Sequence, residues 1–126
     1  MPCVYFVKSK DQIGLIKIGH CSHMQDRLIN LQSGNGFELS LLYHLPCKDK
    51  KEAVALEKDL HETFSYCRRR GEWFTPSRPL RNAIAFMAAG NTWNEAKKLV
   101  KKDIKRKWNQ QLAKERCRKL QLEGKL

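Results

Sequence analysis

The chain has 126 residues, enough for one domain with a sizeable core but not for two domains of ordinary size. Its 25 lysines and arginines against 13 aspartates and glutamates give a net charge of +12, far more than solubility requires. This surplus points to a polyanionic partner, with nucleic acid ahead of an anionic membrane surface. No apolar run approaches the roughly 20 residues of a membrane-spanning helix, so we expect no membrane span.

The basic charge is concentrated near the end of the chain. Residues 81–126 hold 13 basic and 4 acidic residues, whereas residues 1–80 hold 12 and 9. We therefore expect a nearly balanced domain over residues 1–80, followed by a strongly basic helical extension over residues 81–126.

The five cysteines form an odd set without a Cys-x-x-Cys pair, and no signal peptide precedes them. A disulfide framework is therefore not expected, and a reducing, cytoplasmic setting fits the composition better. A zinc site could draw on Cys21, His23, Cys47, His61 and Cys67, but these residues lack the paired spacing of zinc ligands, which makes it the weaker interpretation.

The first predicted elements are a hairpin and a helix. Residues 3–7 are β-branched and aromatic, and a similar run at 15–18 follows a turn-like segment, which is typical of an antiparallel hairpin. Ser22 and Gln25 have the spacing of a capping box, and apolar residues then recur at helical intervals. A helix is therefore expected from about residue 22 to residue 32.

Apolar and polar residues alternate over 37–45, which predicts a third strand with one buried face. Leu56, Leu60 and Phe64 form an apolar stripe on a second predicted helix over 49–64. The order β-β-α-β-α indicates an α/β fold. We expect a small sandwich with a three-stranded antiparallel sheet flanked by helices.

The extension is predicted to be helical. A polar link over 65–70 and two prolines precede a short apolar helix at 80–89. Thr92 and Glu95 then make another capping box, which opens a long basic helix. Its apolar residues recur every three or four positions: Trp93, Ala96, Val100, Ile104, Trp108 and Leu112. We expect this stripe to pack on the domain or on a partner.

Several polar residues could together hydrolyse a phosphodiester, a reaction that needs an activated nucleophile and stabilisation of the charge that develops around phosphorus. Because strand side chains alternate, Tyr5 and Lys17 should face one side of the hairpin and its apolar residues the other. A lysine beside a tyrosine favours the phenolate, the state in which Tyr5 could act as a base.

The predicted helices add a cation and a carboxylate. Arg27 flanks the buried stripe of the first helix, and its guanidinium suits two phosphate oxygens at once. Glu57 and His61 are four residues apart and hence on one helix face, where a carboxylate suits a single Mg²⁺ or Mn²⁺. Taken singly, each residue is more often a packed aromatic, a satisfied histidine or a solvated charge, so the hypothesis depends on the whole set.

Taken in order, these residues resemble the GIY-YIG nuclease superfamily, most closely the small branch typified by a T5-phage reading frame and a meiotically up-regulated yeast gene. The matching segments are residues 3–5 (Gly-Ile-Tyr in the family), 17–19 (Tyr-Ile-Gly in the family), Arg27, 55–64 (the helix with the metal-binding glutamate) and 70–74 (the closing signature). The resemblance covers about residues 3–77.

The resemblance implies a metal-dependent endonuclease that hydrolyses phosphodiester bonds in DNA with Mg²⁺ or Mn²⁺. Tyr5 would activate or position the water, helped by Lys17 or His20. Arg27 would stabilise the phosphorane, and Glu57 would hold the metal. The catalytic residues that we expect on this basis are Tyr5, Lys17, His20, Arg27, His61 and Glu72.

Two departures from the family pattern leave alternatives open. Lys17 replaces the second tyrosine, and the late asparagine of the family has no clear counterpart, with Glu72 at a comparable place. One alternative is a catalytically inactive nucleic-acid-binding or regulatory protein on the same fold. Another is an interaction module whose basic tail meets RNA or an acidic protein.

The long helix supplies the expected nucleic-acid contacts. The residues that we expect to bind DNA phosphates are Lys97, Lys98, Lys101, Lys102, Lys105, Arg106 and Lys107. Such a helix gives salt-sensitive and largely sequence-blind binding, and DNA ranks ahead of RNA as the partner. The alternatives are a solvated helix face, or a surface that docks on the domain or on a second copy. We expect a monomer or a weak homodimer.

Overall fold

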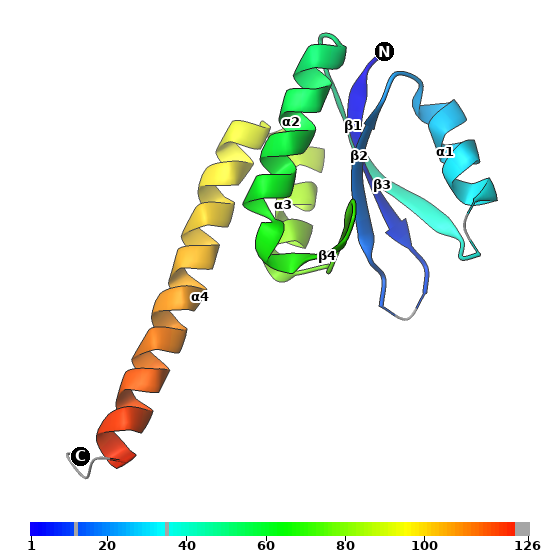
Figure 1. Ribbon diagram of the computed structural model, residues 1–126. Helices are drawn as coiled ribbons and strands as arrows, with labels where there is room; N and C mark the ends of the chain where they lie inside the picture. Colours follow the sequence, from blue (N-terminus) through cyan, green and yellow to red (C-terminus); the bar gives the residue numbers. More distant parts are fainter. Residues whose placement is uncertain (12, 35, 123–126) are drawn as a thin grey trace.

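The computed structural model describes residues 1–11, 13–34 and 36–122, with side chains up to residue 117. Helix α1 covers one face of a single sheet, α2 and α3 cover the other face, and α4 packs outside α3 (Figure 1). The strands are β1 (Cys3–Ser9), β2 (Ile16–Cys21), β3 (Leu39–Pro46), β4 (Arg68–Arg70) and β5 (Trp73–Phe74). The helices are α1 (Met24–Ser33), α2 (Lys50–Thr63), α3 (Arg78–Ala88) and α4 (Trp93–Leu122), with a 3-10 turn at Ser65–Cys67.

The described residues form a sheet of five strands in the order β3-β1-β2-β5-β4, and all neighbouring pairs are antiparallel. The α/β class and the long final helix are confirmed, but the prediction of three strands is wrong. The segment read as a polar link contributes β4, which turns through Gly71, at a φ of 55°, into β5. These two strands could not be predicted, because three consecutive arginines and a two-residue segment show no alternation of apolar and polar residues.

The predicted hairpin of β1 and β2 is confirmed. Tyr5 pairs with Gly19, Phe6 with Ile18, and Val7 with Lys17. Val4, Phe6, Ile16 and Ile18 therefore face the core under α2 and α3, whereas Tyr5 and Val7 face α1. The sheet thus has two separate apolar faces, which is why β1 is buried almost throughout.

Strand β3 does not have the single buried face that its alternation predicts. Phe6 pairs with Tyr43 and Val7 with Leu41, so Leu42 is an extra residue at a bulge. Leu41 therefore joins the core under α1, and Tyr43 joins the core on the opposite face. Phe37, which the pattern placed in the strand, lies before it and is 54% exposed.

The first helix begins later than its sequence predicts. Its N-cap is His23, whose side chain makes no capping hydrogen bond in the described part of the chain, so the predicted capping box of Ser22 and Gln25 is wrong. The predicted cap of α4 forms, and α2 has a cap that was not predicted. Asp49 accepts a hydrogen bond from the Glu52 amide at the start of α2, and Thr92 accepts one from Glu95 before α4.

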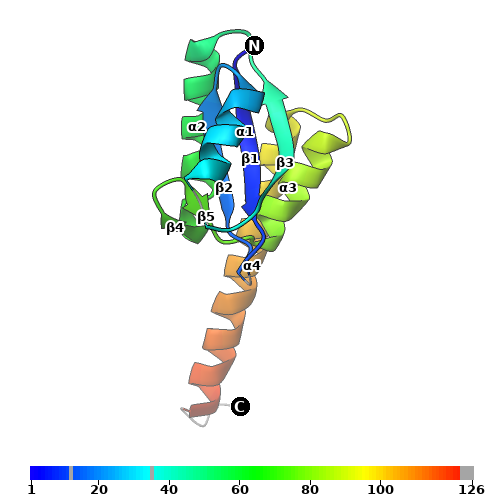
Figure 2. The same cartoon turned by 90° about the vertical axis from the view of Figure 1, so that its right-hand side faces the viewer.

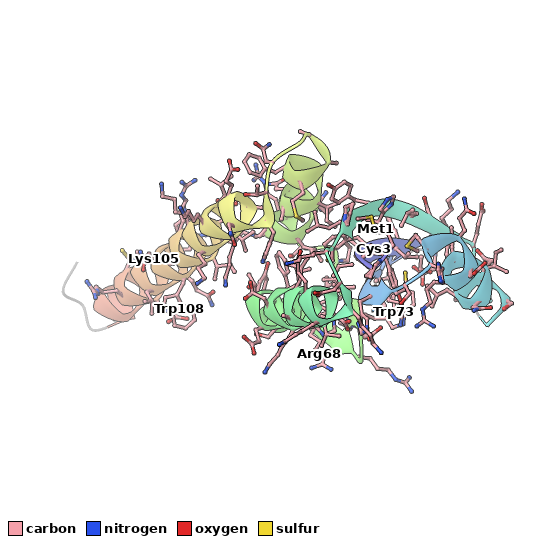
Figure 3. All side chains as sticks on the ribbon, turned by 90° about the horizontal axis from the view of Figure 1, so that it is seen from above. Met1, Cys3, Arg68, Trp73, Lys105 and Trp108 are labelled. Atoms are coloured by element: carbon pink, nitrogen blue, oxygen red, sulfur yellow. The ribbon has the colours of Figure 1, made fainter. Side chains whose placement is uncertain are left out.

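Helix α4 is anchored at its start, and its later part projects from the body (Figures 1 and 2). Trp93, Ala96 and Val100 are buried in the main core, but Trp108 is 61% exposed on the projecting part (Figure 3). The predicted stripe thus packs on the domain only through its first half. None of the helices in the described residues is both long and apolar enough to cross a membrane.

Candidate active site

The candidate site lies at the edge of β2, where the sheet is incomplete. Strand β5 pairs only with Ile16 and Lys17, and the backbone amide of Ile18 donates to the carbonyl of Glu72 (3.0 Å). The rest of β2 passes beneath α2. This places side chains from β2, α2 and the β4–β5 turn next to one another.

Glu57 is at the centre of this group. Its side chain is only 12% exposed and its Oε2 contacts Nδ1 of His20. Nε2 of His61, one helical turn along α2, lies 3.5 Å from Oε1 of Glu57 and donates to the carbonyl of Ile18 (2.8 Å). His20 is thereby oriented with its Nδ1 toward the carboxyl, which leaves Nε2 directed away from it.

Glu72 joins Glu57 to Lys17. Nζ of Lys17 lies 3.1 Å from Oε2 of Glu72, and the two carboxyl groups of Glu72 and Glu57 interact directly. Burial raises the pKa of Glu57. The hydrogen bond with His20 lowers this pKa, and the neighbouring Glu72 carboxyl raises it, so that the net change is a rise. Burial also acts to raise the pKa of Glu72. The hydrogen bond with Glu57 and the ion pair with Lys17 lower it by more, so the net change is a decrease. The pair thus favours a charged Glu72 beside a more easily protonated Glu57.

Tyr5 and Arg27 form a second group on the α1 face of the sheet. Nε of Arg27 donates to Oη of Tyr5 (3.3 Å), and the Tyr5 ring is fully buried. Burial raises the pKa of Tyr5 despite Arg27, so the phenol is protonated at neutral pH. The predicted preference for the phenolate is therefore wrong. Lys17 pairs with Glu72 instead and lies over the ring of Trp73, 5.4 Å from its centroid.

The two groups act on each other through Glu72. Its negative charge contributes to the raised pKa values of both Tyr5 and Arg27, after the larger effects of burial on Tyr5 and of the hydrogen bond on Arg27. Glu72 therefore lies within electrostatic range of the residues on both faces of the sheet. The structure thus divides the seven residues expected at the catalytic and metal sites into two groups: Lys17, His20, Glu57, His61 and Glu72 around the edge of β2, and Tyr5 with Arg27 on the α1 face.

A surface pocket of about 420 Å³ opens beside the Glu57 group. His20, Glu57 and His61 line one part of it, and the cations Lys58 and Arg68 line another. Neither cation was expected at the site from the sequence. The run of three arginines that begins at Arg68 is a charge signal that could have indicated a cation at the site. However, Arg68 reaches the pocket only because strand β4 forms, and the sequence did not predict that strand.

The donor set suits a hard divalent cation. Glu57 and Glu72 offer two adjacent carboxylates, and Mg²⁺ or Mn²⁺ is commonly held by one or two carboxylates and several waters. The unfavourable proximity of two acidic groups would be relieved by a bound cation. The described residues contain no cluster of three or more His, Cys, Asp or Glu side chains suited to a metal, so an ion at Glu57 and Glu72 would take most of its ligands from water. The alternative zinc site is therefore not supported.

The expected DNA-binding residues differ in their surroundings. Nζ of Lys97 lies 2.7 Å from Oδ1 of Asp59, and Nε1 of Trp93 donates to the other oxygen of that carboxylate (2.8 Å). Lys97 thus helps to hold α4 on α2. The remaining side chains are exposed: Lys98, Lys101, Lys102, Lys105, Arg106 and Lys107. Beyond its docked start, α4 leaves the body at the end where β4 lies (Figures 1 and 2).

Comparison with known proteins assigns the chain to a family. No curated protein and no solved structure gives a significant match to the chain. The family model of the T5orf172 domain, which is associated with GIY-YIG-like nucleases, matches residues 2–102. The match includes all five strands, helices α1 to α3 and the docked start of α4. The chain therefore belongs to the T5orf172 domain family.

Proposed function

We propose that the protein is a metal-dependent endonuclease that hydrolyses phosphodiester bonds in DNA. The observation that carries this proposal is the contact between Glu57, Glu72 and His20 at the edge of β2, next to the buried Tyr5–Arg27 pair. The family supports a nuclease-related role in general terms. Carboxylates, a histidine and cations are the groups that phosphodiester hydrolysis requires, and the charge of Glu72 acts on both groups that supply them.

His20 is the best-placed general base. Its Nδ1 is held by Glu57, so Nε2 can accept a proton from a water molecule in the adjoining pocket. Glu57 fixes the imidazole and stabilises the imidazolium that results. Tyr5 is fully buried and protonated at neutral pH, so its role is to accept a hydrogen bond from Nε of Arg27 and thereby to position the guanidinium.

Arg27 and Lys17 supply positive charge. Nε of Arg27 is engaged by Tyr5, and the remaining N–H groups of its guanidinium can bind non-bridging phosphate oxygens. Lys17, only 13% exposed and held by Glu72, offsets the negative charge that substrate brings into the site. These interactions strengthen as charge accumulates on the phosphate, which favours the transition state.

Glu57 and Glu72 would hold Mg²⁺ or Mn²⁺. The ion would supply Lewis-acid stabilisation of the phosphate and of the leaving oxygen. Burial raises the pKa of Glu57, and a bound cation would offset this penalty on the negative charge of its carboxylate. Glu72, whose pKa is lowered, provides the permanent negative charge of the pair.

The exposed cations of α4 favour a second role, in which the protein holds nucleic acid whether or not it cleaves it. Lys101, Lys102, Lys105 and Arg106 are exposed, and none of the ion pairs found among the described residues involves them. We propose that this part of α4 binds DNA phosphates. A catalytically inactive DNA-binding protein would retain this property.

The test is cleavage of supercoiled plasmid by the purified chain with Mg²⁺ or Mn²⁺, and with EDTA as the metal-free reaction. Glu57→Gln keeps the shape of the side chain but removes its charge, and should abolish nicking. Glu52→Gln, at an exposed position on the same helix, is the matched control and should cleave like the wild type. Intact plasmid that is retarded in a gel would favour the inactive DNA-binding alternative, and equal nicking by both variants would refute the assigned site.

A further inference from the structure

Three sulfur atoms meet at the end of the hairpin opposite its turn. Cys3 on β1 pairs directly with Cys21 on β2, and their Sγ atoms are 3.6 Å apart. Met24, in the first turn of α1, places its Sδ 3.9 Å from each of these sulfurs. Cys3 lies on the sheet near Met1, at the side where α1 packs (Figure 3). This cluster takes no part in the proposed phosphodiester chemistry.

The triangle has the dimensions of a three-coordinate metal site. A triangle with sides of 3.6, 3.9 and 3.9 Å has its centre about 2.2 Å from each corner, close to the roughly 2.3 Å of a metal–thiolate bond. An ion at that centre would contact all three sulfurs without a change in the backbone. The sulfurs already lie where the ligands of a trigonal ion would be.

Two thiolates and one thioether are soft ligands, which select Cu(I) over the hard cations that suit Glu57 and Glu72. Zinc would require a fourth ligand, and a thioether is not among the donors it prefers. We propose that Cys3, Cys21 and Met24 bind one Cu(I) ion in a trigonal site of three sulfurs.

The site is shielded but open to an ion from outside. Cys3 is 3% exposed, whereas Cys21 and Met24 are half-buried. A surface pocket of about 380 Å³ reaches the cluster and is lined by Cys3 and Met24, with His23 and His44 at its wall. An ion could therefore enter through this pocket and then be protected from water by the packing of α1 on the sheet.

Binding is a ligand exchange without electron transfer. Cu(I) enters in that oxidation state, two copper–thiolate bonds form, and the two thiol protons of Cys3 and Cys21 pass to solvent. The Met24 thioether donates a lone pair and loses no proton. The bound ion would link β1, β2 and α1, the elements that carry Tyr5, His20 and Arg27, and so should raise the unfolding temperature of the chain.

The test begins with Cys117→Ser, because Cys117 is an exposed free thiol that would bind soft metals on its own. This protein is titrated without oxygen with Cu(I) complexed by bathocuproine disulfonate, whose colour falls as the ion transfers to protein. Transfer of one ion per chain is expected. X-ray absorption at the copper edge should show three sulfur neighbours at about 2.2–2.3 Å.

Further substitutions in this background identify the ligands. Cys21→Ser should lose the bound ion, and Met24→Leu should hold it less tightly and show two sulfur neighbours. Met87→Leu alters a buried methionine in the other core and is the matched control, with one ion expected. Circular dichroism confirms folding of each variant, and Cys3→Ser is omitted because its position is buried.

Four results would overturn the proposal. The first three are the absence of a transferred ion, undiminished binding in Cys21→Ser, and a copper edge dominated by nitrogen neighbours. The fourth is a Cys3–Cys21 disulfide already present in the protein as purified in air, which would appear as two missing thiols that a reductant restores. Since none of these readouts involves DNA cleavage, the result is independent of the proposed nuclease function.

Discussion

The ring of Tyr5 passes directly over Gly19 on the neighbouring strand. A Cβ atom at Gly19 would lie 2.4 Å from the Tyr5 oxygen and 2.6 Å from the carbon that bears it. Glycine is therefore required here for space, so that the phenol can cross β2 and meet Arg27 on α1. This explains physically why the segment Lys17-Ile18-Gly19 ends in glycine.

Gly19→Ala should destabilise the fold by about 1–3 kcal/mol, the usual cost of forcing extra volume into a packed core. The Tyr5 ring is fully buried and cannot move aside without disturbing its neighbours. Urea unfolding measures the effect. Gly36→Ala is the matched control, because no atom lies within 4 Å of its added Cβ. Equal stability of the two variants would contradict the close packing of Tyr5 on Gly19.

Glu57→Gln should become more stable relative to the wild type as the pH rises from 4 to 7. The folded-state pKa of Glu57 is raised, so its contribution to stability is fully present below the unfolded value of about 4.5 and is lost as the pH rises through the folded pKa. Gln removes this loss. Thermal unfolding at the two pH values tests the sign.

Glu52 provides the contrast for that experiment. It lies exposed in the first turn of α2, where a negative charge favours the helix. Glu52→Gln should therefore lower stability slightly at pH 7. A Glu57→Gln protein that loses stability in the same way would show that burial does not penalise the Glu57 charge.

Local sequence patterns were sufficient to predict much of the fold. The hairpin could be predicted because two β-branched runs flank a turn, and α2 because it carries an apolar stripe. The bulge at Leu42 could not be predicted, since it depends on how β3 pairs with β1. The added strands β4 and β5 likewise form only because β2 offers them an edge.

The site shows the same division. The ordered spacing of the sequence predicted which residues would lie near one another, but it did not predict their protonation. Tyr5 and Lys17 do face one side of the hairpin, as strand alternation predicts. Their electrostatic states depend on burial and on Glu72, which joins them from a turn more than fifty residues away. Sequence spacing contains no information on either effect.

Asp59 should stabilise the attachment of α4 above pH 4 and lose this effect in acid. Although burial opposes it, the hydrogen bonds from Lys97 and Trp93 lower the pKa of Asp59. The stabilisation is therefore present above the unfolded value of about 3.8 and is lost as the pH falls through the folded pKa. Asp59→Asn should cost about 1–2 kcal/mol at pH 6 and much less at pH 3.

Urea unfolding at both pH values measures this loss, and a double-mutant cycle with Lys97→Gln isolates the ion pair. The Lys97→Gln substitution should have little further effect once Asp59 is replaced. Additive losses at pH 6 would show that the two side chains do not act as a pair.

Lys102→Gln with Lys105→Gln should weaken DNA binding and reduce its dependence on salt. Each neutralised phosphate contributes about −0.9 to the slope of log affinity against log salt, so removal of two contacts should lower the slope by up to about 2. Both side chains are exposed on α4. Fluorescence anisotropy with a labelled duplex, in EDTA to prevent cleavage, gives the slope.

Lys50→Gln with Lys51→Gln removes the same charge from the start of α2, and this control should alter the slope less. If both pairs changed it equally, binding would follow net charge alone, and α4 would not be the DNA-binding element.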